Sequence, residues 1–338
     1  LLHDLQRRAQ AGTSYEELGE ELGQGSMGVV HQAMQPGLQR KVAIKKLKDE
    51  KAPPEDILAL LQEAWTTSAL EHPNIIPVYE LALDPKGAPL VVLKHITGVP
   101  WSELMHSPPR IEGYLKEEDA LDWNLRTLAR IAKALHFAHQ RGVVHRDVKP
   151  RNVMCDSFGQ VYLTDWGIAV GTRAEDRGFI PLATEIAELA GTPGYMAPEM
   201  MAPGEPHVGP RTDVYLLGAI LYEILAGHAP HSGPDLGAIL ASVRKSQPNL
   251  PPSAPPYLVE VCTRAMSRRI EDRYPSAEAF AQALAEFSKV RASARLVFEA
   301  NQRLDAFEQK LMRAMNDSSE PHRAARLYDA FGACRFGF

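Results

Sequence analysis

The stretch that decides the fold reads His-Arg-Asp-Val-Lys-Pro-Arg-Asn, from His145 to Asn152, and the run Asp165-Trp-Gly begins thirteen residues later. These runs place two carboxylates, an ammonium and an amide too close in sequence to lie far apart in space. Phosphoryl transfer needs such a set, because it depends on an in-line hydroxyl, neutralised phosphate oxygens and rigidly held divalent ions. We interpret Asp147 as the residue that orients the hydroxyl and Lys149 as the neutralising cation. Asn152 and Asp165 are the predicted Mg²⁺ ligands.

A glycine-rich run lies near the start of the chain, with glycines at Gly23, Gly25 and Gly28. Glycine lets the backbone approach a phosphate closely, since no side chain stands in the way. The same spacing occurs in dinucleotide-binding folds, where the last glycine opens a helix and an acidic residue follows about 20 positions later. Here the sequence continues as a strand towards Val-Ala-Ile-Lys, which ends at Lys45. A nicotinamide site is therefore not favoured.

Lys45 can reach the α- and β-phosphates of a nucleotide from a strand if another group holds its ammonium in place. The predicted helix over residues 55–70 carries Glu63, which is the candidate partner. The order of these motifs along the chain is the order that phosphoryl transfer from a nucleotide would need.

Taken together, these motifs resemble the eukaryotic-like (Hanks-type) protein kinase superfamily. The resemblance covers residues 15–287 and includes Ala-Pro-Glu ending at Glu199, Asp213 and Arg273. It implies an α+β fold of two lobes, a small β-rich lobe over residues 15–96 and a large helical lobe over 97–287. It also implies a buried ion pair between Glu199 and Arg273, and bracing of the catalytic-loop backbone by Asp213.

The resemblance is closest to serine/threonine kinases, because Lys149 follows Asp147 by two residues and Gly-Thr-Pro-Gly-Tyr surrounds Thr192. In that family Thr192 would form hydrogen bonds near Asp147 and Lys149. The sequences of the glycine-rich run and of Tyr-Met-Ala-Pro-Glu are similar to those of bacterial members of the superfamily. The implied cofactors are ATP and Mg²⁺, with Mn²⁺ as an alternative ion, and the implied substrates are proteins with serine or threonine, the chain itself included.

By the same resemblance, the adenine of ATP would lie between the lobes and contact the backbone that joins them. Leu93 is the expected gatekeeper. The alternative for the apolar residues is ordinary core packing. The expected adenine-site residues are Val30, Ala43 and Met154 around the base, and Lys94, His95 and Ile96 in the hinge.

The segment from Asp165 to Glu199 spans 35 residues, which is long for a loop without a function. An arginine before the catalytic aspartate, here Arg146, is typical of kinases whose loop is ordered when a phosphate pairs with that guanidinium. The regulatory threonines are Thr184 as first choice, Thr172 as second, and Thr192. The alternative is a loop that is never modified.

Composition excludes several other classes of protein. Lys and Arg number 37 against 42 Asp and Glu, a net charge of −5, so no basic excess favours nucleic-acid binding. Cys155, Cys262 and Cys334 are isolated, which argues against a zinc site or disulfide framework and suits a reducing cytosol. No apolar run approaches the roughly 20 residues that span a bilayer. We therefore expect a cytoplasmic protein, with no membrane segment in this fragment.

The regions outside the kinase resemblance are a lead segment, residues 1–14, and a helical hairpin over residues 288–338. Apolar residues recur at intervals of three and four from Leu296 to Met315, which predicts an amphipathic helix. A break over 316–321 and a second helix over 324–334 would follow. Three roles stay open: packing on the large lobe, self-association or partner docking, and the start of a truncated helical region.

Two alternatives to a protein kinase stay in view. A nucleotide-binding scaffold of the pseudokinase type would signal by conformation, but such proteins usually lose one member of the set Lys45, Glu63, Asp147, Asn152 and Asp165, which is complete here. A small-molecule kinase of related fold is disfavoured by the peptide-supporting segment that ends at Glu199.

One departure from the family pattern concerns the apolar side chains stacked between the lobes. Leucine is usual where Thr67 stands, and phenylalanine is usual where Trp166 stands. A buried indole N–H prefers a hydrogen-bond partner. Our hypothesis is that the smaller Thr67 leaves room for the Trp166 ring and accepts a hydrogen bond from it.

Overall fold

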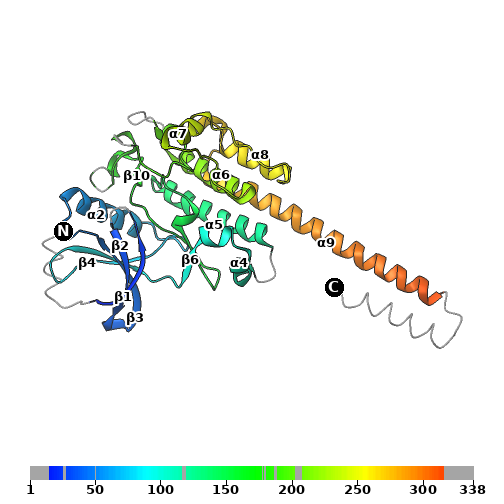
Figure 1. The fold of residues 1–338 in the computed structure, drawn as a ribbon, viewed down its shortest axis with the longest axis horizontal. Coiled ribbons are helices and arrows are strands. Elements are labelled where there is room, and N and C mark those ends of the chain that lie inside the picture. Colours follow the sequence, from blue (N-terminus) through cyan, green and yellow to red (C-terminus); the bar gives the residue numbers. More distant parts are fainter. Residues whose placement is uncertain are drawn as a thin grey trace. The chain divides into compact units, whose positions relative to one another are not determined.

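A computed structural model describes residues 15–25, 28–49, 51–115, 119–176, 178, 180–185, 189–201 and 208–315 of the chain (Figure 1). The chain divides into two units between Leu284 and Ala285, and each unit is described by itself. Within the described residues, no helix has both the length and the apolar character that a membrane span requires.

The first unit begins with a five-stranded sheet in the order β1-β2-β3-β5-β4, whose neighbouring strands are antiparallel. Its strands are β1 (Glu16–Gln24), β2 (Gly28–Gln35), β3 (Arg40–Leu47), β4 (Val78–Leu83) and β5 (Pro89–Lys94). Successive side chains of a strand point to opposite faces. Accordingly Leu90 and Val92 join one buried cluster with Ile44, while Val91 joins another with residues of the helix α2 (Pro54–Ser68).

The α2 helix covers one face of this sheet because its apolar residues recur at helical spacing. Pro54 occupies the first turn, where its missing N–H costs nothing, and Leu60, Leu61 and Ala64 are buried. Glu63 lies between these buried residues, so the packing of α2 fixes the position of its carboxylate.

The rest of the first unit is mainly helical, which confirms the predicted α+β fold with two lobes. Its helices are α3 (Trp101–Met105), α4 (Pro108–Leu115), α5 (Ala120–Gln140), α6 (Pro210–Ala226), α7 (Leu236–Lys245), α8 (Pro256–Ala265) and the start of α9 (Ala277–Met315). Its short strands are β6 (Gly98–Pro100), β7 (Val143–Val144), β8 (Val153–Asp156), β9 (Val161–Leu163) and β10 (Val170–Gly171). Single turns of 3₁₀ helix complete the described elements: η1 (Pro36–Leu38), η2 (Pro150–Asn152), η3 (Ala174–Asp176), η4 (Ala183–Glu185), η5 (Pro198–Met201) and η6 (Ile270–Asp272).

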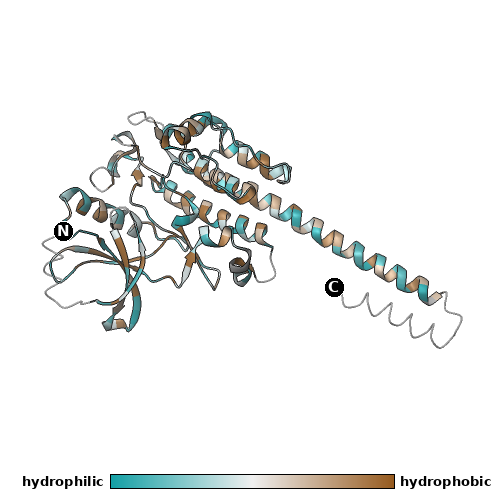
Figure 2. Ribbon diagram, viewed as in Figure 1, coloured by the Kyte–Doolittle hydropathy of each residue, from teal (hydrophilic) through white to brown (hydrophobic). Residues whose placement is uncertain are grey.

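The α6 helix forms the centre of the large lobe and packs against α5 and α8. It is buried from Thr212 to Glu223 and is rich in apolar residues, as Figure 2 shows. Gly218 allows the close approach of α8, because a Cβ atom at this position would lie 2.7 Å from the Cβ atom of Ala265. Asp213 in the first turn of α6 is completely buried, so this helix carries a charge into the core.

An ion pair anchors the end of the segment that precedes α6. Both terminal nitrogens of Arg273 donate to the Glu199 carboxylate, at 2.6 and 2.8 Å, and both side chains are buried. The contact predicted from the sequence is therefore present. Arg273 also donates to the carbonyls of Ser267 and Arg211, so four of its five guanidinium hydrogens have an acceptor.

The α9 helix differs from the expectation of a separate helix after residue 288. It runs without interruption from Ala277 to Met315, so its first two turns belong to the first unit and the rest to the second. No glycine or proline occurs between these residues, and nothing in the sequence ends the helix at the predicted boundary. The lead segment 1–14, the break over 316–321 and the second helix over 324–334 lie outside the described residues.

Candidate active site

The glycine-rich turn joins β1 to β2, where Gly23 pairs with Val30 and the N–H of Gly25 donates to the Gly28 carbonyl at 2.9 Å. A Cβ atom at Gly28 would lie 2.9 Å from the carbonyl oxygen of Lys46, so the packing of β2 on β3 requires glycine here. No such contact arises at Gly23 or Gly25. Protein packing therefore does not explain these two glycines, which is consistent with a role towards a ligand.

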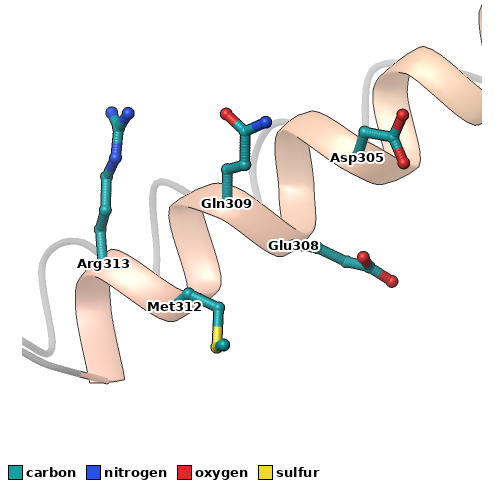
Figure 3. A pocket seen from close by; sticks show the side chains of 5 residues that line it. All are labelled: Asp305, Glu308, Gln309, Met312 and Arg313. Carbon is teal, nitrogen blue, oxygen red and sulfur yellow. The ribbon is translucent and has the colours of Figure 1, made fainter.

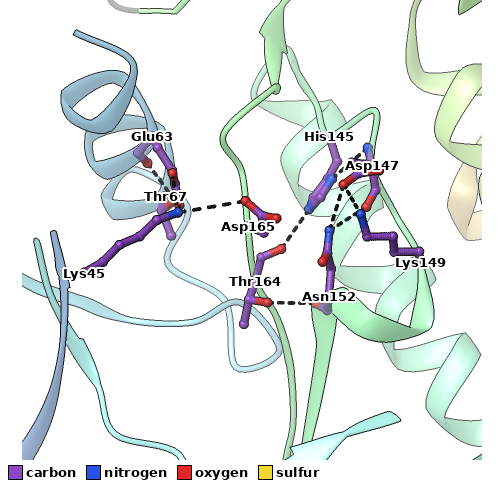
Figure 4. Close-up of polar contacts among 9 residues, drawn as sticks. All are labelled: Lys45, Glu63, Thr67, His145, Asp147, Lys149, Asn152, Thr164 and Asp165. Carbon is purple, nitrogen blue, oxygen red and sulfur yellow. Dashed lines mark hydrogen bonds and ion pairs between the residues drawn. The ribbon is translucent and has the colours of Figure 1, made fainter. Parts of the chain in front are cut away.

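An ion pair joins β3 to α2 beside this turn. The ammonium of Lys45 lies 2.5 and 2.7 Å from the two carboxylate oxygens of Glu63, and 4.0 Å from an oxygen of Asp165 (Figure 4). Burial raises the pKa of the Glu63 carboxyl, and the Lys45 ammonium opposes this shift. β3 and α2 thus bring the Lys45 ammonium to the Glu63 carboxylate, the partner predicted from the sequence, and Asp165 approaches the same cation from the loop after β9.

The loop between β7 and η2 carries the predicted base. The two oxygens of Asp147 accept separate bonds, one from the Thr192 hydroxyl at 2.7 Å and one from the Lys149 ammonium at 2.6 Å, and Figure 4 shows the second of them. Lys149 also donates to the Thr192 hydroxyl oxygen at 2.6 Å. These three side chains form a closed ring, so the orientation of the Asp147 carboxylate is fixed before any substrate arrives.

The carboxylate of Asp213, at the start of α6, accepts hydrogen bonds from the backbone of this loop. Its two oxygens accept from the N–H groups of His145 and Arg146, both at 2.9 Å, and His139 lies 2.8 Å from one of them. Burial alone would raise the pKa of Asp213, but the bonds from His139 and from the loop backbone hold it below its ordinary value. The contact between His139 and Asp213 was not predicted from the sequence, because the two residues are 74 positions apart and no local motif marks the pair.

The residues predicted to bind a metal fit that role by their donor atoms. The amide nitrogen of Asn152 donates to the carbonyl and a carboxylate oxygen of Asp147, at 2.9 and 3.1 Å, which leaves the amide oxygen as the ligand atom. Asp165 has a half-exposed carboxylate and a left-handed backbone, with φ of 63°. A carboxylate and an amide oxygen are the hard ligands that Mg²⁺ prefers.

The predicted adenine-site residues lie on β2, β3, β5 and β8. Val30 is opposite Lys45, and Ala43 is opposite the expected gatekeeper Leu93, in adjacent strands. Met154 lies on β8, in the large lobe.

The hinge residues begin with Lys94, the last residue of β5. The ammonium of Lys94 lies 5.1 Å from the ring centre of Tyr162, and the ring of His95 lies 3.0 Å from the Gln32 amide. Both side chains are thus engaged by the protein. Ile96 is the last residue of the predicted hinge.

The predicted regulatory residues occupy different environments. Arg146 is buried and donates to the Ile168 carbonyl at 3.2 Å, while its Nε atom has no partner among the described residues. Burial lowers the pKa of its guanidinium, and Asp213 opposes this shift. The Thr172 hydroxyl donates to the Gly142 carbonyl at 3.0 Å. Thr184 is exposed in η4.

The hypothesis of a hydrogen bond between Thr67 and Trp166 is wrong. The Thr67 hydroxyl donates to the Glu63 carbonyl at 2.7 Å, a common local bond of threonine within a helix. The indole nitrogen of Trp166 is buried without a hydrogen-bond partner among the described residues. Its ring packs against His145 instead, with ring centres 4.5 Å apart.

Two surface cavities lie apart from this constellation, and none of the described residues that line them belongs to it. One, of about 360 Å³, lies between the loop before β4, α5 and the β8–β9 turn; its lining includes His72, Asn74, Arg130 and Tyr162. The other, of about 460 Å³, borders α9 and is lined by Asp305, Glu308, Gln309, Met312 and Arg313 (Figure 3). The chemistry of the site thus rests on the convergent side chains of Figure 4.

Comparisons with known proteins agree with this geometry. The family model described as "Protein kinase domain" matches residues 16–294. The chain is 36% identical over 270 residues to the serine/threonine-protein kinase PknB of Mycobacterium tuberculosis and to PknB of Mycolicibacterium smegmatis, each match covering 77% of this chain and 41% of the relative. It is 33% identical to a probable serine/threonine-protein kinase of Streptomyces coelicolor, with 78% and 38% covered. The chain thus spans about two fifths of the length of these bacterial relatives.

Proposed function

This chain belongs to the protein kinase family, and we propose that it transfers the γ-phosphate of ATP to serine and threonine hydroxyls of proteins, itself included. The observation that carries the proposal is the closed ring of Asp147, Lys149 and Thr192. It presents one oriented carboxylate beside one cation, which is the arrangement that a hydroxyl and a moving phosphoryl group require.

Each polar residue of the site has a definite task in this proposal. Lys45, held by Glu63, binds the α- and β-phosphates, and the turn from Gly23 to Gly28 approaches the phosphates with backbone N–H groups. Asp147 orients the attacking hydroxyl and accepts its proton, while Lys149 neutralises charge on the transferred group. When bound, Mg²⁺ neutralises the phosphate oxygens. Asn152 and Asp165 are the residues that would hold the ion.

The apolar residues position the adenine in this proposal. Val30 and Ala43 cover the base from the small lobe, and Met154 covers it from the large lobe. Leu93 closes the back of the site, and the backbone from Lys94 to Ile96 reads the edge of the base. Support comes from the neighbouring positions of these residues on paired strands.

Labelled ATP with Mg²⁺ tests the proposal. Asp147→Asn should bind ATP as before but transfer phosphate about 10² to 10⁴ times more slowly, because it removes a base and an orienting group. Asp165→Asn should lose Mg²⁺-dependent ATP binding, and the exposed Asp305→Asn on α9 is the matched control with unchanged activity. Wild-type protein that binds ATP with Mg²⁺ yet never labels itself or a generic substrate would instead support the scaffold alternative.

Regulation by phosphorylation of Thr184 or Thr172 forms part of the proposal. Support comes from Arg146, whose buried Nε atom lacks a partner among the described residues and could pair with a phosphate. Thr184 is favoured because it is exposed, whereas the Thr172 hydroxyl already donates to Gly142. Mass spectrometry of active protein should find the phosphate on this segment. An unmodified segment in fully active enzyme would contradict this part.

The setting of the protein is also a proposal. Cys155 and Cys262 are buried and unpaired, which suits a reducing cytoplasm that supplies ATP. The net charge of −5 favours protein partners over nucleic acid. We propose in addition that the region after residue 288 serves self-association or partner docking, because many of its apolar side chains are exposed.

A further inference from the structure

The part of α9 that belongs to the second unit exposes several large apolar side chains, and three of them recur at a fixed interval. Val290, Val297 and Leu304 follow one another at seven residues and are 69%, 60% and 52% exposed. Leu311, half-buried, continues the series. Apolar residues recur along the whole helix, as Figure 2 shows. A monomeric soluble protein rarely leaves such a stripe in water, so this face needs a partner.

The spacing of the stripe matches a coiled coil. Three residues after Val290, Val297 and Leu304 stand Ser293, Ala300 and Phe307; the spacing alternates between three and four, with a polar residue only at Ser293. Such a pattern repeats every 3.5 residues, whereas a helix packed on a globular core follows 3.6. Val290 and Val297 are β-branched, as the a residues of two-stranded coiled coils often are. The pattern therefore points to pairing of α9 with another copy of itself.

We propose that residues 290–315 of α9 pair with the same residues of a second copy of this chain as a parallel, two-stranded coiled coil. At 1.5 Å per residue, the paired segment would be about 39 Å long. The first series, Val290, Val297, Leu304 and Leu311, occupies the a positions of the heptads.

The charges beside the seam select the parallel orientation. In a parallel pair, each g residue lies next to the e residue five positions later in the partner helix. Arg303 would then lie beside Glu308 of the second copy, an attractive pair that occurs twice by symmetry. The other g and e residues are Lys289 with Ala294, Leu296 with Asn301, and Lys310 with Met315. No pair of g and e residues in this parallel arrangement brings two like charges together.

The directions of the side chains agree with this placement. Glu308 and Met312 project from one side of α9, whereas Gln309 and Arg313 project from the opposite side (Figure 3). Glu308, at an e position, flanks the proposed seam, and Met312, at a b position, lies further from it on the same side. The helix surface away from the seam carries charges of both signs, including an ion pair between Arg295 and Glu299 at 3.0 Å. A helix that lies on anionic lipid would instead carry mainly lysine and arginine there.

Pairing would have a consequence for phosphorylation that rests on the proposed kinase function. Two kinase units joined by one coiled coil experience a high effective concentration of each other. Phosphorylation of one copy by the other would then not depend on chance encounter. The oligomeric state itself is independent of catalysis, so the two proposals can fail separately.

Sedimentation equilibrium of the full chain without nucleotide tests the pairing. Wild-type protein should be a dimer at micromolar concentrations, and Val297→Glu/Leu304→Glu should be a monomer, because it places charge at two a positions. The matched control is Ala292→Glu/Ala306→Glu, whose sites lie at c positions and are exposed, and it should remain a dimer. Circular dichroism reports whether each variant keeps its helix.

A charge exchange tests the parallel register. Arg303→Glu and Glu308→Arg should each weaken dimerisation about tenfold, since two attractive pairs become repulsive. A mixture of the two variants should restore dimerisation, because each mixed pair brings opposite charges together again. Rescue in the mixture is possible only between chains.

Four outcomes would overturn the proposal. The first is a monomeric wild-type chain. The second is a mixture that associates no better than either charge variant alone. The third is a monomer that dimerises only after residues 316–338 are removed, which would assign the face to the chain's own C-terminal segment. The fourth is a monomer that co-sediments with vesicles containing anionic lipid, which would assign the face to a membrane surface.

Discussion

At the residue scale, the hydroxyl of Thr67 bonds within its own helix and not to Trp166. The Thr67 hydroxyl donates to the Glu63 carbonyl, and the indole N–H of Trp166 makes no hydrogen bond among the described residues. Thr67→Val should therefore lower the free energy of unfolding by about 1 kcal/mol, the value of one local hydrogen bond. The loss should be the same within about 0.5 kcal/mol in a Trp166→Phe background. Urea unfolding of the four proteins measures the coupling; a clearly larger value would show that the two side chains interact.

His231 gives a pH dependence at the same scale. It is buried, 2.9 Å from the Tyr215 hydroxyl and 3.1 Å from the Ser242 hydroxyl, and burial lowers its pKa to about 4 from 6.5. As the pH falls below the unfolded-state value, the unfolded chain binds the proton first. Stability should therefore fall between pH 6.5 and 4, by about 2 kcal/mol at pH 5 from this group alone.

Urea unfolding at pH 7 and pH 5 measures this effect in wild-type protein and in His231→Gln. The variant should lose less stability between the two pH values, because glutamine does not titrate. An identical loss in both proteins would show that His231 does not set the pH dependence.

The residues of the candidate site could be predicted to lie together because they belong to short local motifs. Asp147, Lys149 and Asn152 lie within six residues. His139 could not be predicted, since its contact with Asp213 depends on the packing of α5 against α6. The Thr67 hydroxyl could either accept a hydrogen bond from the Trp166 indole or donate one to the backbone of its own helix. The structure shows the second.

At the scale of elements, the ion pair between Glu199 and Arg273 should dominate the attachment of the segment before α6. Glu199→Gln leaves the buried Arg273 guanidinium without its counter-charge, so the free energy of unfolding should fall by roughly 3 kcal/mol. The control is Glu299→Gln in the exposed pair with Arg295 on α9, which should cost less than about 0.5 kcal/mol. Urea denaturation measures both. Equal losses would mean that burial does not decide the strength of these pairs.

Element types were easier to predict than element ends. The predicted helix over 55–70 is α2, Pro54–Ser68, but the helix predicted to begin after residue 288 is a continuation of α9. The reason is physical: a helix ends where a cap, glycine or proline favours its end, and α9 contains no glycine or proline up to Met315. A change in hydrophobic pattern marks what a helix packs against rather than where it stops.

At the scale of the whole molecule, the arrangement of the elements was predicted from the resemblance to a known family and not from the periodicity of apolar residues. The strand order β1-β2-β3-β5-β4 requires pairing between strands that are not consecutive, as between β3 and β5. Alternating side chains identify a strand but not its neighbour in the sheet. The strand order could be expected only from the set of motifs, because these motifs occur together in one fold family.

The proposed pairing of α9 and the proposed kinase activity together predict how autophosphorylation depends on protein concentration. In the full chain, the autophosphorylation rate per molecule should stay constant once the protein concentration exceeds the dissociation constant of the dimer. Each kinase unit then already has its partner. In Val297→Glu/Leu304→Glu the rate per molecule should rise in proportion to concentration, as expected for random encounter. Phosphorylation of a generic peptide should be equal in both proteins, because these residues lie outside the catalytic constellation.

Labelled ATP at a series of protein concentrations measures these rates, with Ala292→Glu/Ala306→Glu as the control that should behave like the wild type. Adding unlabelled Asp147→Asn protein as an acceptor identifies transfer between chains. If the monomeric variant labels itself at a rate per molecule that does not change with concentration, phosphate transfer occurs within one chain. Pairing through α9 would then have no part in autophosphorylation, even if the dimer forms.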